Sequence, residues 1–322
     1  MIPVTILTGF LGAGKTTLLN RILTAPSHKR IAVVVNEFGD IGIDDQFIAR
    51  RSDDIIELTN GCVCCSARND TMEILLALAQ KARQGVPIDQ VIIETTGLAK
   101  PAALARFFLG GAPLQAHFNL DGIVTVVDAF FGVSQFVQYP EVKEQIGVAD
   151  IVLINKIDLA QETQIAHLES WIRGINPTAQ IVRCSSGDVP IEKLLGIGGF
   201  GADVQIQDEH SSASSEQADH IHDRDITSVS IRESSPLDRG KFLRWLHEFV
   251  AMEGGDLLRY KGVILFSGAK ERAILQGVHM INEISSGGSW PDGIHQETML
   301  VFIGRRLMED VIREGIMGCI AK

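Results

Sequence analysis

The sequence has no cluster of basic residues, and acidic residues predominate. It contains 29 lysines and arginines against 40 aspartates and glutamates, which gives a net charge of -11 at pH 7. Binding to nucleic acid without sequence preference relies on clustered lysines and arginines that neutralise phosphates. We therefore expect no nucleic-acid partner, whereas an acidic surface suits cations.

Long hydrophobic runs are absent as well. The segment from Met1 to Gly9 has no basic region ahead of its apolar residues, no small-residue cleavage site, and too few apolar residues to span a bilayer. These absences predict a cytoplasmic protein with no membrane partner.

Cysteine is scarce and unevenly spread. Of the five cysteines, Cys62, Cys64 and Cys65 are clustered, while Cys184 and Cys319 stand alone. This is not the distribution of a disulfide framework. In a reducing compartment, such a cluster favours metal binding.

Short runs of β-branched residues alternate with amphipathic stretches through residues 1–203. Strands are predicted at 4–8, 31–35, 54–58, 90–94, 122–128, 150–155 and 180–183, with helices from about residue 15 and near residues 70–84. This alternation predicts an α/β domain with a doubly wound, mostly parallel sheet.

The hydrophobic periodicity stops between residues 204 and 225, where Ser, Asp, Glu and His dominate. We predict a linker there, because 322 residues exceed the usual size of one domain. Residues 226–322 are expected to form a smaller C-terminal α+β domain with an antiparallel sheet. Its strands are predicted at 226–231, 262–266, 273–278 and 299–303, and its helices at 237–252 and from residue 308.

A phosphate-binding loop follows the first predicted strand. The segment Gly9-Phe-Leu-Gly-Ala-Gly14-Lys15-Thr16 matches G-x-x-x-x-G-K-[ST] and lies between a strand and a helix, as a P-loop NTPase requires. Its backbone amides and the helix N-terminus suit phosphates. Lys15 is expected to reach the β- and γ-phosphates, and Thr16 to ligate Mg²⁺. The nucleotide-contacting residues predicted in this loop are Gly9, Gly12, Ala13, Gly14, Lys15, Thr16 and Thr17.

Two further strand ends complete the predicted nucleotide site. Glu94 ends a buried strand and precedes the turn residue Gly97, as expected of a carboxylate on the Mg²⁺ side with a γ-phosphate sensor. Asn155-Lys156-Ile-Asp158 fits N-K-x-D after another strand. Asp158 can accept hydrogen bonds from guanine N1–H and the 2-amino group, which adenine lacks. The sequence therefore predicts GTP as the nucleotide, with the turn Cys184-Ser-Ser186 beside the base.

The three clustered cysteines form the predicted metal site. Cys62, Cys64 and Cys65 follow a strand and the turn-forming pair Asn60-Gly61, at the sheet edge expected to hold the nucleotide. Soft thiolates select Zn²⁺, Cu(I) or similar ions, and Co²⁺ or Ni²⁺ can also bind. Three thiols leave a tetrahedral site one ligand short, and a carboxylate, a histidine or water must supply the fourth.

The carboxylate best placed to supply that ligand is Glu37, in the segment after the second strand. In P-loop proteins this segment orders around Mg²⁺ and the γ-phosphate. If Glu37 meets the cysteines only when the segment is ordered, GTP tightens the metal site and hydrolysis loosens it.

Other interpretations of these residues are weaker. Redox thiols require C-x-x-C spacing, which only Cys62 and Cys65 provide, and Cys64 interrupts it. The linker histidines His210, His220 and His222 lie among carboxylates and could collect metal loosely, but a solvated linker is the simpler interpretation.

Together these motifs resemble those of the CobW-type GTPases, relatives of the GTPases that mature hydrogenase and urease. The resemblance extends into the second half of the chain, through segments 258–262, 275–278 and 299–304. It implies a metallochaperone with slow GTP hydrolysis that passes zinc from the C-x-C-C motif to an apo-metalloprotein client. Some relatives carry long histidine-rich runs, whereas this chain has only three histidines between residues 210 and 222.

Two alternatives to zinc delivery stay open at this point. One is a metal sensor or buffer whose GTP state signals to a partner protein. The other is a cobalt-delivery protein for cobalamin synthesis, a role linked to some family members. No water-orienting residue stands out, so hydrolysis is either slow or completed by a partner or by a second copy of the chain in a homodimer.

Overall fold

The computed structural model describes residues 1–26, 29–36, 55–59, 67–109, 113–199, 226–291 and 293–322. The chain divides into two compact units, residues 1–172 with 179–200, and residues 173–178 with 201–322. The predicted linker, residues 204–225, lies outside the described part. Within the described part, no helix has the length and apolar character needed to cross a membrane.

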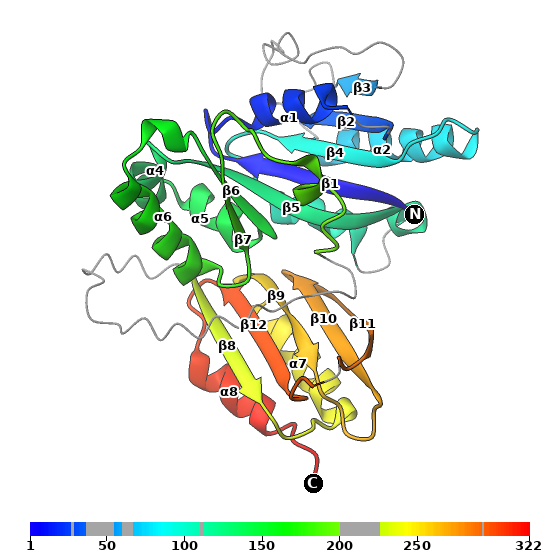
Figure 1. Ribbon diagram of the computed structural model, residues 1–322. Coiled ribbons are helices and arrows are strands. Elements are labelled where there is room, and N and C mark those ends of the chain that lie inside the picture. The colour runs from blue at the N-terminus through cyan, green and yellow to red at the C-terminus, as the bar shows by residue number, and fades with distance from the viewer. Residues whose placement is uncertain (27–28, 37–54, 60–66, 110–112, 200–225, 292) are drawn as a thin grey trace. The chain divides into compact units, whose positions relative to one another are not determined.

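The first unit is built on a sheet of seven strands in the order β3-β2-β4-β1-β5-β6-β7 (Figure 1). All neighbouring strands are parallel. This confirms the predicted doubly wound α/β fold. The strands are β1 (Ile2–Gly9), β2 (Ile31–Asn36), β3 (Ile55–Thr59), β4 (Gln90–Thr95), β5 (Phe118–Asp128), β6 (Ile151–Asn155) and β7 (Gln180–Arg183).

Six α-helices accompany these strands in the described residues. They are α1 (Lys15–Thr24), α2 (Ala67–Arg83), α3 (Pro101–Ala105), α4 (Gly132–Gln138), α5 (Pro140–Gly147) and α6 (Glu162–Ile175). Both α3 and α5 begin with proline, whose fixed φ suits the first turn of a helix. The helices predicted from residue 15 and near residues 70–84 correspond to α1 and α2.

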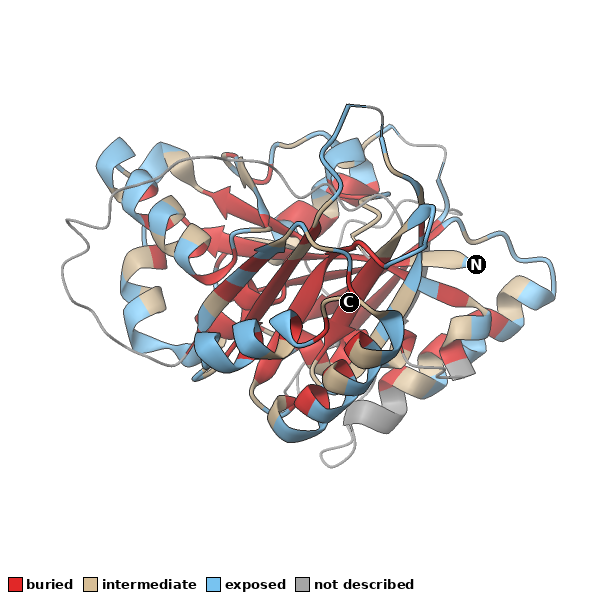
Figure 2. Ribbon diagram, turned by 90° about the horizontal axis from the view of Figure 1, so that it is seen from below, coloured by how far each residue is buried: buried red, intermediate tan, exposed pale blue. Residues whose placement is uncertain are grey.

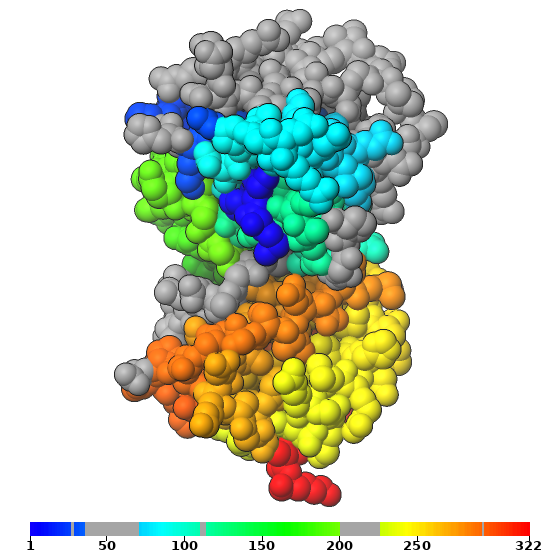
Figure 3. Space-filling model, turned by 90° about the vertical axis from the view of Figure 1, so that its right-hand side faces the viewer, coloured from blue at the N-terminus to red at the C-terminus, as the bar shows by residue number. Residues whose placement is uncertain are grey.

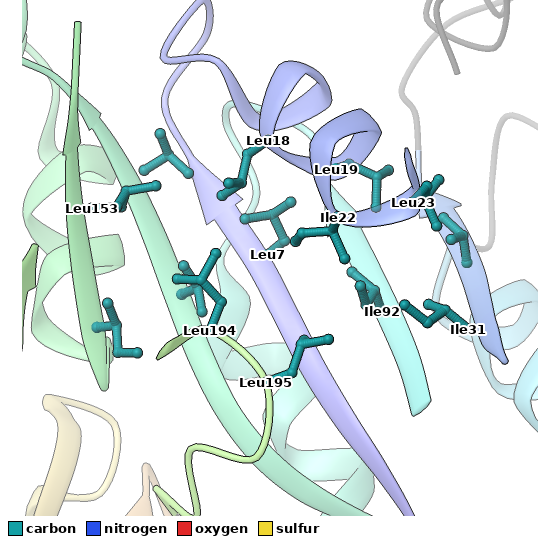
Figure 4. Packing of buried hydrophobic residues seen from close by; sticks show 14 of the residues in the cluster. Leu7, Leu18, Leu19, Ile22, Leu23, Ile31, Ile92, Leu153, Leu194 and Leu195 are labelled. Atoms are coloured by element: carbon teal, nitrogen blue, oxygen red, sulfur yellow. The ribbon is translucent and has the colours of Figure 1, made fainter. Parts of the chain in front are cut away.

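The apolar face of α1 packs on the sheet. Leu18, Leu19, Ile22 and Leu23 recur at helical spacing and lie against Leu7 of β1 and its neighbours (Figure 4). The alternate β1 residues, including Ile6, are buried too, so both faces of this strand are covered. Figure 2 shows the strands as largely buried and the helices as partly exposed.

The sheet order changes direction at β1, which lies between β4 and β5. In Figure 3 the dark-blue atoms of the chain's first residues lie between the cyan and teal segments that flank them. Since ligands of such sheets bind beyond the carboxyl ends of the strands at this point, the loop after β1 occupies the expected position for a nucleotide site.

The second unit contains a five-stranded antiparallel sheet in the order β11-β10-β9-β12-β8 and two helices. This confirms the predicted α+β architecture. The elements are β8 (Thr227–Glu233), α7 (Arg239–Glu253), β9 (Leu257–Ile264), β10 (Glu271–Val278), β11 (Ile281–Ser289), β12 (Thr298–Gly304) and α8 (Glu309–Met317). Phe242 and Leu246 of α7 pack against Tyr260 and Phe302 of the sheet.

The packing of α1 in the core of the first unit predicts the effect of truncating one of its buried side chains. Leu19 is fully buried, so Leu19→Ala is expected to lower the free energy of unfolding by about 3 kcal/mol through lost burial and a residual cavity. Leu76→Ala on α2, where the side chain is 43% exposed, is the matched control and is expected to cost less than about 1 kcal/mol. Urea denaturation followed by circular dichroism measures both, and equal losses would contradict this packing.

Candidate functional site

The loop between β1 and α1 forms a tight turn around its own backbone. The Ala13 amide donates to the Phe10 carbonyl at 3.2 Å, and Lys15 Nζ donates to the same carbonyl at 3.3 Å. Gly14 has φ 104°, and a Cβ there would collide with the side chain of Asn155. Glycine is therefore required at this position both by its backbone conformation and by the close approach of β6.

Thr16, in the first turn of α1, meets Glu94 near the carboxyl end of β4. The Thr16 hydroxyl donates to Glu94 Oε1 at 2.9 Å, and Glu94 is buried. These are the two residues predicted to hold Mg²⁺, and the fold brings their oxygens together although they are far apart in the sequence. Hard oxygen donors of this kind suit Mg²⁺.

The turn after Glu94 is anchored by a buried glutamine that the sequence did not single out. Gln145 of α5 donates through Nε2 to the carbonyls of Gly97 and Ala99, each at 3.1 Å. A Cβ at Gly97 would collide with Leu11 of the phosphate loop. The turn that contains the predicted γ-phosphate sensor therefore packs directly on the phosphate loop.

Asn155, at the end of β6, connects three segments. Its Nδ2 donates to the Ala13 carbonyl at 3.0 Å, and its Oδ1 accepts from the Gly187 amide at 2.9 Å. The side chain is buried. In this structure the Asn155 side chain is hydrogen-bonded to the protein backbone, and it connects the phosphate loop to the turn after β7.

Lys156 follows in the left-handed conformation, with φ 63°. Its Nζ donates to the Gly12 carbonyl at 2.7 Å and to Asp128 Oδ2 at 2.7 Å. Asp128 ends β5 and is almost fully buried. No sequence motif includes Asp128, so it was not among the predicted site residues.

Asp158 is an exposed acid at this edge. It lies in the short 3-10 segment Ile157–Leu159, directly after Lys156. The Ile157 amide donates to the Cys184 carbonyl at 3.3 Å, which places the predicted turn Cys184-Ser-Ser186 beside the N-K-x-D segment. Within the N-K-x-D segment, the Asp158 carboxylate is exposed to solvent, whereas Asn155 is buried.

The two isolated cysteines are core residues. Cys184 is buried, its thiol contacts Asn155 Oδ1 at 3.4 Å, and burial raises its pKa to about 11. Cys319 is buried in the second unit, where its thiol contacts the Gly315 carbonyl at 3.1 Å and burial also raises its pKa. Both thiols are therefore protonated at neutral pH and unsuited to metal.

The predicted metal ligands Glu37, Cys62, Cys64 and Cys65 lie outside the described residues. Among the residues that are described, no group of three or more His, Cys, Asp and Glu side chains could hold a metal ion. The strands that lead to the predicted ligands are described. β2 and β3 are parallel neighbours, with Val35 opposite Thr59, and Val35 also lies opposite Glu94 of β4.

Comparison with known proteins identifies the family. Residues 3–183 match the CobW/HypB/UreG nucleotide-binding domain, and residues 226–320 match the C-terminal domain of the cobalamin synthesis protein CobW. The chain belongs to the CobW/HypB/UreG family. The resemblance inferred from its motifs is confirmed.

Relatives of this CobW-family protein match over nearly its whole length. A protein of Escherichia coli strain K12 named zinc chaperone YjiA is 35% identical over 320 residues, covering 98% of each chain. A protein of Sinorhizobium named zinc chaperone CobW is 31% identical and covers 96% of this chain and 94% of its own. The crystal structure of Zn(II)-bound YjiA GTPase from E. coli has a TM-score of 0.77 at 30% identity, covering 99% of each chain. The chain is a GTPase.

The exposed carboxylate of Asp158 predicts a change in base selectivity. Asp158→Ala is expected to weaken GDP binding by roughly 10- to 100-fold, because hydrogen bonds from guanine to a charged acceptor are lost, and to remove the preference for GTP over ATP. Asp188→Ala, which removes an acid with an 81% exposed side chain in the turn after β7, is the control and is expected to retain both. Titration with fluorescent nucleotides measures the affinities, and a retained preference for GTP in Asp158→Ala would contradict this assignment.

The raised thiol pKa values predict selective alkylation. At pH 7.5 the folded protein is expected to leave Cys184 and Cys319 unmodified by iodoacetamide, because only the thiolate reacts, whereas both react in denaturant. Peptide mapping by mass spectrometry distinguishes these positions. Rapid alkylation of Cys184 in the folded state would contradict the burial of this thiol.

Proposed function

We propose that this GTPase is a metallochaperone that binds zinc at Cys62, Cys64 and Cys65, with Glu37 as a further ligand, and delivers it to an apo-metalloprotein client. Relatives named zinc chaperones over nearly the full chain support the metal, as does a Zn(II)-bound structure of one of them. Thiolates are soft ligands suited to zinc.

The observation that carries the proposal is the register of three neighbouring strands. Glu37 follows the last residue of β2, and the cysteine segment begins after the last residue of β3. Val35 lies opposite both Thr59 and Glu94, and adjacent strands are about 4.8 Å apart. The chain therefore enters the Glu37 segment beside the strand that carries Glu94, and it enters the cysteine segment one strand further along the sheet.

The nucleotide site has groups suited to binding the phosphates, Mg²⁺ and the guanine base of GTP. The amides of the phosphate loop and the amino group of Lys15 suit the phosphates. The Thr16 hydroxyl and the Glu94 carboxylate, 2.9 Å apart, would hold Mg²⁺, which neutralises developing charge between the β- and γ-phosphates. Asp158 would read guanine, while Asn155 keeps the phosphate loop in position.

Coupling between the two sites follows from their adjacency. An ordered segment after β2 would add the Glu37 carboxylate to the thiolates, so the state with GTP bound would hold zinc more tightly than the state with GDP bound. Reversal of this ordering after hydrolysis would release zinc to a client. Coupling of this kind is reciprocal, because each ligand changes the affinity for the other by the same factor.

The coupling predicts nucleotide-dependent zinc affinity. Titration against a competing chromophoric chelator is expected to give zinc binding on the order of tenfold tighter with a non-hydrolysable GTP analogue than with GDP. Cys64→Ala is expected to abolish this difference. Cys319→Ala, which removes a thiol of the second unit that is buried, is the matched control and is expected to preserve it. Equal zinc affinity with GTP analogue, with GDP and without nucleotide would exclude the delivery cycle.

A further inference from the structure

We propose that Asp128 is a positioning residue of the nucleotide site, which acts by holding the lysine of the N-K-x-D segment against the phosphate loop. The proposal concerns the GTPase site alone and does not depend on the metal. Nothing in the sequence motifs includes Asp128, which ends β5.

The position of Asp128 in the sheet places it at the nucleotide edge. It lies opposite Asn155 in the parallel register of β5 and β6, and the Ala129 amide donates to the Asn155 carbonyl at 2.8 Å. β5 is also the direct neighbour of β1, which leads into the phosphate loop. Asp128 is therefore the last residue of a strand that lies between β1, which leads into the phosphate loop, and β6, which leads into the N-K-x-D segment.

Each oxygen of the Asp128 carboxylate has its own partners. Oδ2 accepts from Lys156 Nζ at 2.7 Å. Oδ1 accepts from the amides of Phe130 and Phe131 at 2.8 and 3.0 Å. The turn that begins α4 thus fixes the carboxylate, and the fixed carboxylate orients the lysine.

The lysine transmits this constraint to the phosphate loop. Lys156 Nζ donates to the Gly12 carbonyl at 2.7 Å as well as to Asp128. The Asp128 side chain is 2% exposed and that of Lys156 is 31% exposed, so water screens this ion pair less than a surface pair. The lysine side chain is flexible because its ammonium stands on a four-carbon stem. The Asp128 carboxylate restricts that flexibility and keeps the Lys156 ammonium at the Gly12 carbonyl.

Removal of the Asp128 carboxylate is expected to change the affinity for nucleotide and to have little effect on the rate of the hydrolysis step. The hydrogen bonds of the Asp128 carboxylate lead to Lys156 and to the Phe130 and Phe131 amides, and its effect passes through Lys156 to the phosphate loop. Loss of the anion is therefore expected to weaken GTP and GDP alike and to raise KM, while kcat at saturating GTP stays within about twofold of wild type, as for the loss of uniform binding.

The substitution Asp128→Asn separates the two functions of the carboxylate. An asparagine oxygen can still accept from the Phe130 and Phe131 amides, whereas its NH₂ group faces the Lys156 ammonium and cannot accept from it. The variant is expected to keep the turn and lose the ion pair. Asp121→Asn is the matched control, because Asp121 is another buried acid of β5, bonded to Thr5 Oγ1 at 3.2 Å and to the Gly196 amide at 2.8 Å. That control is expected to keep wild-type nucleotide affinity.

A double-mutant cycle tests the proposal. Fluorescent GDP titration is expected to give roughly tenfold weaker binding for Asp128→Asn, a loss between that of an exposed ion pair and that of a fully buried one. Lys156→Met is expected to weaken binding at least as much, and the double variant is expected to be no weaker than Lys156→Met, because Asp128 acts through Lys156.

Additive losses in the double variant would overturn the proposal, as would wild-type affinity and KM in a folded Asp128→Asn protein. If Asp128→Asn does not fold, Asp128→Glu replaces it in the same cycle, since it retains the charge and displaces it by one methylene. Melting temperatures without nucleotide identify the folded variants.

Discussion

Two hydrogen bonds of the buried Asn155 side-chain amide, one donated and one accepted, hold the geometry on which the nucleotide site depends. Its Nδ2 donates to the Ala13 carbonyl in the phosphate loop, and its Oδ1 accepts from the Gly187 amide after β7. Loss of the hydrogen-bond partners of a buried amide destabilises the folded state, because the amide is then removed from water without compensation. The phosphate loop and the turn beside Asp158 therefore keep a fixed relation to each other, and Gly14 is required because Asn155 approaches so closely.

The predicted nucleotide residues converged because each motif stood at a strand end, and a parallel sheet gathers those ends at one edge. The residues that sequence reasoning missed, Asp128 and Gln145, are single side chains whose partners lie far along the chain. No local pattern marks them. Strand β11, Ile281–Ser289, was also missed, because its serines and glycines lack apolar alternation and pairing with β10 determines its conformation. The predicted metal ligands fall outside the described residues.

Parallel register also gives the metal proposal its physical basis. Val35 has Thr59 on one side and Glu94 on the other. The segment that contains Glu37 therefore begins next to the strand that supplies Glu94, and the segment that contains the three clustered cysteines begins one strand further along. A nucleotide that orders the chain after β2 acts at the same place where a fourth ligand would join the thiolates. We therefore propose that this metal site is gated by the nucleotide.

The measurement that tests this account most directly is GTP affinity with and without zinc. Linkage requires that zinc tighten the binding of a non-hydrolysable GTP analogue by the same factor by which the analogue tightens zinc. The account predicts that saturating Zn²⁺ strengthens binding of the analogue in the wild type and leaves GDP binding nearly unchanged. An affinity for the analogue that is the same with Zn²⁺ and with a chelator would contradict it, because the two sites would then be independent.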